Sequence, residues 1–139
     1  MEAYGHLTTP ADDPLSARLA ALWEDLTGLL SDLRPDVVVV ERVLFQVNAR
    51  TAMSVGQASG LALAAAGRAG CAVAQYSPNE VKLAITGYGS ATKEQVQRMV
   101  QVLLALERPP RPADRADALA LAVCHLSGAG LRAAAGVPT

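Results

Sequence analysis

The sequence predicts an α/β domain in which a small sheet is covered by helices. Residues 37–40 are four consecutive valines, a pattern typical of a strand buried on both faces, as in parallel sheets. Leucines recur at helical spacing between Leu15 and Leu33. Alanine and leucine dominate a composition that is 51% hydrophobic and 4% aromatic, which suits an alanine-rich helical shell on such a sheet.

Length and charge narrow the class of protein. A chain of 139 residues predicts one domain with a single core. The net charge of −1 gives no overall sign of nucleic-acid binding, so any site for a polyanion would be a local patch. Cys71 and Cys124 lack the spacing of metal ligands, which favours buried free thiols. Without a signal peptide or a transmembrane run, we expect a cytoplasmic protein with no membrane association.

The first half of the chain predicts alternating strands and helices. We expect a strand over residues 2–8, and a helix that begins with Pro14 at its first position and stops at Arg34-Pro35. The valine strand follows and ends at Glu41. A helix over about residues 47–68 and a strand over residues 71–76 complete this half.

The second half predicts three helices. Capping-box patterns at Ser77 and Thr92 begin two of them, and Gly87 ends the first. The last helix starts near Ala113, and its residues 118–124 are apolar on every side, which predicts burial. Residues 128–139 lack a clear pattern and are expected to form a flexible tail.

Three carboxylates stand at places where chemistry is common. Glu41 ends the valine strand, where α/β proteins bind ligands, although a first solvated residue after the strand would look the same. Asp114 and Asp117 are neighbours on the last helix and could simply stabilise its N-terminus. Asp117 is expected to be buried, and therefore paired or bound to a cation. Clustered carboxylates are ligands for Mg²⁺ or Mn²⁺, ions that commonly serve phosphoryl chemistry.

A series of motifs then points to a known family. Over about residues 2–125 the chain closely resembles RuvC, the bacterial Holliday junction resolvase, and is most similar to the actinobacterial type. The motifs, in order, are Glu41-Arg42-Val43, Asn48, Gly56-Gln57-Ala58, Pro78-Asn79-Glu80-Val81-Lys82, Thr86-Gly87-Tyr88-Gly89, Lys93-Glu94-Gln95-Val96 and Pro112-Ala113-Asp114-Arg115-Ala116-Asp117-Ala118-Leu119-Ala120.

The resemblance implies a fold and an activity. The fold would be a ribonuclease H-like mixed sheet flanked by helices. The activity would be that of a homodimeric endonuclease, dependent on Mg²⁺ with Mn²⁺ as a plausible substitute, which resolves four-way DNA junctions in recombination and repair by paired symmetric cleavage. The complete site would hold two ions, and the branch-migration motor of RuvA and RuvB would be its partner.

The resemblance also implies roles for single residues. Glu41, Asp114 and Asp117 correspond to catalytic metal ligands, and Lys82 and Lys93 to positions that face DNA.

Other residues are weaker candidates. Arg42, Arg50 and Arg115 are further candidates for DNA binding, although each of these cations, like the two lysines, could be a solvated surface charge. Phe45 follows the position of an aromatic residue near the junction centre, and could act there or lie in the core.

The helix over about residues 50–66 is rich in glycine, alanine and serine. Small residues allow close approach of a partner surface, which could be the sheet or a second subunit. The resemblance favours the second subunit, because this helix forms the dimer face in the family.

The chain departs from the family pattern at its start. The family opens with a strand ending in Asp-Pro-Gly, whose aspartate completes the metal site, and the early acids Glu2, Asp12 and Asp13 follow no apolar strand. We therefore expect residues 1–127 to be an N-terminally truncated nuclease domain that lacks the first hairpin and is inactive or impaired. A miscalled start codon, a deliberately shortened chain or a degenerate paralogue would each explain this.

Two other functions compete with junction cleavage. A non-catalytic junction-binding or dimerising remnant would need the lysines but not Glu41. A small-molecule-binding α/β domain is disfavoured, because no glycine-rich phosphate loop follows a strand.

Overall fold

The computed structural model describes residues 5–42 and 49–134. Within these ranges the chain forms five helices and two strands. The five helices correspond to the five that the sequence predicted. The chain divides into two compact units, which are described here one at a time. The N-terminal unit is Leu7–Gln75, and the C-terminal unit combines Met1–His6 with Tyr76–Thr139.

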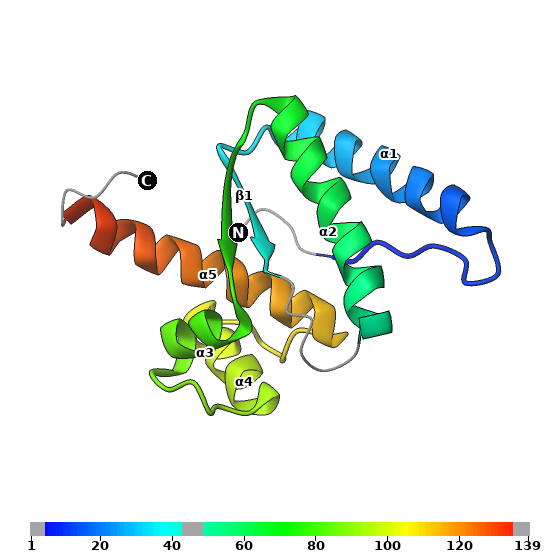
Figure 1. Ribbon diagram of the computed structural model, residues 1–139. Coiled ribbons are helices and arrows are strands. Elements are labelled where there is room, and N and C mark those ends of the chain that lie inside the picture. The colour runs from blue at the N-terminus through cyan, green and yellow to red at the C-terminus, as the bar shows by residue number, and fades with distance from the viewer. Residues whose placement is uncertain (1–4, 43–48, 135–139) are drawn as a thin grey trace. The chain divides into compact units, whose positions relative to one another are not determined.

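The N-terminal unit is a strand–helix–strand motif preceded by a long helix. Its elements are α1 (Leu15–Leu33), β1 (Val37–Glu41), α2 (Ala49–Ala69) and β2 (Ala72–Tyr76). The strands pair directly, and their starts are joined where the amide of Ala72 donates to the carbonyl of Asp36 at 3.1 Å. Both strands therefore run in the same direction, with α2 as the crossover, and α1 packs along α2 (Figure 1).

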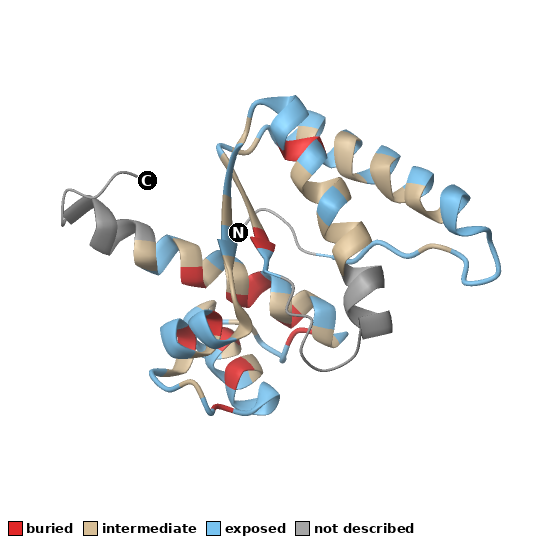
Figure 2. Cartoon of the chain, viewed as in Figure 1, coloured by how far each residue is buried: buried red, intermediate tan, exposed pale blue. Residues whose placement is uncertain are grey.

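The C-terminal unit is a three-helix cluster. Its helices are α3 (Pro78–Thr86), α4 (Lys93–Leu103) and α5 (Ala113–Ala134), and each packs against the other two. Buried residues of all three gather into one core, in which Val100 is fully buried (Figure 2). The core residues are Val81, Ile85, Ala91, Val96, Val100, Leu119, Ala120 and Cys124.

Both predicted capping boxes are confirmed. The amide of Glu80 donates to Ser77 Oγ at 3.2 Å, and the amide of Ser77 donates to Glu80 Oε2 at 2.6 Å. Thr92 and Gln95 exchange the equivalent bonds at 3.2 and 2.8 Å. Gly87 ends α3 with a φ of 87°, a left-handed conformation that favours glycine.

The predicted first strand and the predicted start of the first helix are both wrong. Residues 5–8 are not in a strand, and the rest of the expected strand lies outside the described residues. Pro14 is the residue that caps α1 rather than its first helical residue.

The valine strand is less buried than predicted. Only Val40 is buried, while Val37, Val38 and Val39 are half-buried. Within the described residues β1 pairs with one strand, β2, and helix α2 packs on β1. The two faces of β1 are therefore not both fully covered.

The last helix differs from its prediction in extent and burial. It continues to Ala134, so residues 128–134 are helical rather than part of the expected tail. Ala118 and Ala122 are exposed, because α3 and α4 leave part of the helix surface uncovered. Cys124 is buried as predicted, but Cys71 is only half-buried, and both are free thiols.

No helix of the described ranges is both long enough and apolar enough to cross a membrane.

Candidate active site

Glu41 lies where the valine pattern placed it, at the end of β1. It is the last residue of that strand, and its side chain is exposed. The next residue, Arg42, reaches the neighbouring strand, where its Nη2 donates to the carbonyl of Gln75 at 3.5 Å. Because β1 and β2 are parallel, Glu41 and Arg42 stand at the edge of the sheet where strand carboxyl ends meet, the usual binding edge of α/β folds.

Asp114 and Asp117 lie in the first two turns of α5. Asp114 is in the first turn of α5 and is exposed, and residues three apart on a helix share a face. The core side of this helix is instead formed by Ala116, Leu119 and Ala120. The two carboxylates therefore project from the unit as an accessible pair.

The prediction that Asp117 is buried is wrong. Its side chain is 44% exposed and forms an ion pair with Lys93, whose Nζ lies 3.4 Å from Asp117 Oδ2. Helix α4 supplies this cation from its first residue, which is positioned by the Thr92 capping box. Asp117 is therefore paired with a cation, as predicted, but the reason given for the pairing, burial of the carboxylate, is wrong.

The carboxylates suit a hard divalent cation. Mg²⁺ is commonly held by one or two carboxylates with waters and substrate phosphates completing its shell, and exposed neighbouring aspartates can provide this. Within the described ranges no group of three or more His, Cys, Asp or Glu side chains lies close enough together to hold a metal. Asp114 and Asp117 belong to the C-terminal unit, whereas Glu41 belongs to the N-terminal unit.

The predicted DNA-binding cations are distributed over both units. In the C-terminal unit, Lys82 is half-exposed on α3, Lys93 is at the start of α4, and Arg115 follows Asp114 and donates from Nε to His6 Nδ1 at 3.2 Å. In the N-terminal unit, Arg42 is exposed, and Arg50 lies in the first turn of α2 with its side chain outside the described part. Phe45 falls outside the described residues.

One contact near α5 was not predicted from the sequence. The hydroxyl of Tyr76, at the end of β2, lies 2.7 Å from His125 Nδ1 on α5, and the two rings are 5.9 Å apart between centroids. Tyr76 and His125 both belong to the C-terminal unit, so the bond joins the helix that carries both aspartates to the residue just before α3 begins its capping box. The one sequence signal was a histidine that follows the apolar run of the helix.

Comparisons with known proteins agree with the motifs. The family described as Crossover junction endodeoxyribonuclease RuvC matches residues 1–125. A RuvC of Salinispora arenicola is 53% identical over 130 residues, which are 94% of this chain and 74% of the relative. A RuvC of Moorella thermoacetica is 50% identical over 129 residues, 93% of this chain and 77% of the relative.

Solved structures of the same family have the same fold. A Thermus thermophilus RuvC structure is 38% identical and matches with a TM-score of 0.82 over 90% of this chain and 75% of its own. T. thermophilus RuvC in complex with a Holliday junction substrate matches with the same TM-score and identity over 89% of this chain. The fold is therefore ribonuclease H-like, and the chain belongs to the RuvC family of crossover junction endodeoxyribonucleases.

Proposed function

We propose that this chain acts on four-way DNA junctions through the carboxylates Glu41, Asp114 and Asp117. Its family consists of nucleases for such junctions, and one structural neighbour is bound to a Holliday junction substrate. The observation that carries the proposal is the accessible aspartate pair of α5 with Lys93 at 3.4 Å, because it combines metal ligands with a cation for phosphate. Paired symmetric cleavage in recombination and repair is the corresponding activity.

The proposed roles follow from charge and position. When bound, Mg²⁺ or Mn²⁺ would neutralise the phosphate and activate water for hydrolysis, with two ions in the complete site. Glu41, Asp114 and Asp117 would hold the metal. Lys82 and Lys93 would bind the junction phosphates, as would Arg42, Arg50 and Arg115, and we assign Phe45 to the junction centre.

A homodimer formed through α2 is part of the proposal. Gly56 is half-buried and Gly60 exposed, and a Cβ added at either position would meet no atom within 4 Å. These glycines are therefore not needed for packing within the described chain, and a second subunit is a reason for them. The motor formed by RuvA and RuvB would work with the dimer, in the cytoplasm.

One substitution and a matched control variant test whether α2 forms the dimer interface. Gly60→Leu should leave the fold intact but give monomers in analytical ultracentrifugation, because a large side chain would prevent close approach of two helices. Gly28→Leu on α1 is the control, since a Cβ there also meets nothing within 4 Å. Equal sedimentation of both variants and the unmodified chain would remove α2 from the interface.

We also propose that the printed 139 residues cleave poorly by themselves. They supply three of the four ligands that the family resemblance implies, and an incomplete site holds fewer ions. A normal cleavage rate of a four-way junction by this chain with Mg²⁺ would refute this. A non-catalytic junction-binding module is the alternative, and it would retain its full function as Glu41→Gln.

Metal binding tests the site without depending on cleavage. If the carboxylates hold Mg²⁺, the ion should stabilise the chain by about 2.7 kcal/mol at about 100 times its dissociation constant. Asp114→Asn/Asp117→Asn should abolish the gain in a thermal unfolding assay, while Asp32→Asn, an exposed acid on α1, should retain it. An equal gain in both variants would place the ion elsewhere.

A further inference from the structure

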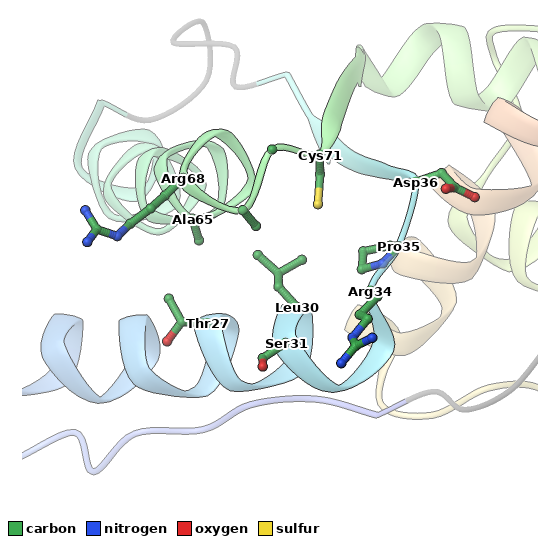
Figure 3. A pocket seen from close by; sticks show the side chains of 11 residues that line it. Thr27, Leu30, Ser31, Arg34, Pro35, Asp36, Ala65, Arg68 and Cys71 are labelled. Atoms are coloured by element: carbon green, nitrogen blue, oxygen red, sulfur yellow. The ribbon is translucent and has the colours of Figure 1, made fainter.

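The N-terminal unit contains a cavity of about 650 Å³ between the C-terminal ends of α1 and α2. Leu30 and Cys71 point into this space from opposite sides, and Arg34 and Arg68 lie at its two ends (Figure 3). Cavities that hold small molecules commonly measure about 300–1,000 Å³, so this one has the size for a ligand.

The cavity is remote from the proposed catalytic edge. Asp36 lines it just before β1, whereas Glu41 ends that strand. Five residues of extended chain span about 16 Å at roughly 3.3 Å each. A ligand in the cavity would therefore occupy a separate site on the same unit.

The charges at the cavity favour an anion. Arg34 and Arg68 are exposed, and within the described residues neither guanidinium group has a hydrogen bond or ion pair. With Asp36 the lining carries a net charge of +1, from two arginines and one aspartate. Guanidinium groups bind phosphate through two parallel hydrogen bonds, and the Ser31 hydroxyl can add another.

Arginines at these places also have a structural use. Arg34 caps α1, and Arg68 is in the last turn of α2, where positive charge stabilises a helix. That use explains their charge but not the apolar space between them, which Leu30, Ala65 and Pro35 line. An apolar floor between two cations fits a ligand with both a ring or aliphatic body and an anionic group.

We propose that this cavity binds a phosphate-bearing small molecule of nucleotide size. The apolar body rests on Leu30 and Ala65. The exposed side chains of Arg34 and Arg68, which are directed away from the space in Figure 3, turn inward to hold the phosphates. Arginine side chains take the place of the glycine-rich loop that other nucleotide sites use.

Calorimetric titration of the full chain with ADP tests this assignment. The titration is carried out with EDTA, so that a metal bridge to the carboxylates of the proposed catalytic site cannot contribute. ADP should bind, and both adenosine and inorganic phosphate should bind at least about tenfold more weakly, because each lacks half of the contacts. No binding of ADP, or equal binding of any two probes, would overturn the proposal.

Matched variants separate the ligand site from helix stabilisation. Arg34→Gln and Arg68→Gln should each weaken ADP binding by about tenfold or more, whereas Arg98→Gln on the exposed face of α4 should not. Thermal unfolding without ligand measures any loss of stability in each variant. Unchanged ADP affinity in both cavity variants would refute the assignment.

Cys71 offers a second readout of the location. Its thiol lines the cavity and is half-buried, whereas Cys124 is buried in the other unit. Bound ADP should slow alkylation of Cys71 by iodoacetamide in the Cys124→Ser variant. ADP that binds without protecting Cys71 occupies a different site, and this result would also refute the proposal.

Discussion

The two units of this chain bury their apolar side chains to different degrees. In the C-terminal unit, α3, α4 and α5 all contribute buried residues to one core around Val100 (Figure 2). Among the described residues of the N-terminal unit, only Val40, Ala65 and Ala66 are buried, and α1 has none. Leu15 and Leu33 of that helix are 52% and 53% exposed.

The difference shows which unit depends on a covering surface. The core of the C-terminal unit is closed by its own helices, so its stability should be largely intrinsic. The C-terminal unit also exposes some large apolar side chains, such as Val102 and Leu126, but it has a closed core beneath them. The N-terminal unit leaves several leucines of α1 exposed without such a core, and large apolar patches on a monomer usually mark an interface. The proposed dimer through α2 would cover part of this surface.

Burying a charge in each unit should give the largest contrast. Val100→Asp should cost about 3–5 kcal/mol, because Val100 is fully buried and the new acid would be removed from water. Val38→Asp should cost only about 1–2 kcal/mol, since Val38 is half-buried and its acid would keep contact with water. Urea unfolding followed by circular dichroism gives both free energies, with Trp23 fluorescence as the report from the N-terminal unit.

Equal costs would contradict the comparison. In that case either β1 would be as tightly packed in solution as α4, or the half-exposed valines would be covered by a second copy of the chain. Repeating the measurement at lower protein concentration distinguishes the two cases, because only the dimer depends on concentration.

Helix caps give a smaller contrast between the units. Ser77→Ala and Thr92→Ala should each cost about 1 kcal/mol, because each hydroxyl accepts a backbone amide in a capping box. In the N-terminal unit the capping residue Pro14 makes no side-chain bond, so Pro14→Asp should stabilise α1 by about 0.5 kcal/mol. Thermal unfolding measures these changes.

The loop residue Ser90 supplies the control for the caps. It is exposed and outside both capping boxes, so Ser90→Ala should be neutral. If Ser90→Ala costs as much as Ser77→Ala, the hydroxyls act through solvation and not through the caps.

Local signals explain most of what the sequence predicted correctly. A capping box joins residues only three apart, so Ser77 and Thr92 could be recognised without knowing the fold. The position of Glu41 at the end of β1 could be predicted because the run of valines stops abruptly there. The family and its fold could be predicted because the motifs occur in order along nearly the whole chain, and the comparisons confirmed both.

Burial was predicted less well because it depends on neighbours. An alanine-rich helix looks apolar on every side, but alanine is tolerated at the surface, as Ala118 and Ala122 show. The ion pair of Asp117 joins residues 24 apart, and the bond between Tyr76 and His125 joins residues 49 apart. No local pattern carries such contacts, and the cavity between α1 and α2 likewise exists only once the helices have packed.

The smallest expected effect on stability belongs to Lys93, and it separates stability from function. Its ion pair with Asp117 joins side chains that are 64% and 44% exposed, so Lys93→Gln should cost less than about 0.5 kcal/mol. If Lys93 binds a junction phosphate, the same variant should lower the slope of log K against log salt by about 1. Fluorescence anisotropy with a four-way junction at several salt concentrations measures this slope.

Arg42→Gln extends the same measurement to the N-terminal unit. Arg42 is exposed and bonded to the Gln75 carbonyl, and as a phosphate ligand it should lower the slope by a similar amount. Similar losses from both variants would mean that the junction contacts both units, although the units differ in how well they are packed. A loss from Lys93→Gln alone would confine the DNA surface to the better-packed unit, next to the aspartate pair. Lys93→Arg keeps the charge and should keep the slope, which distinguishes a phosphate contact from a change in the shape of α4.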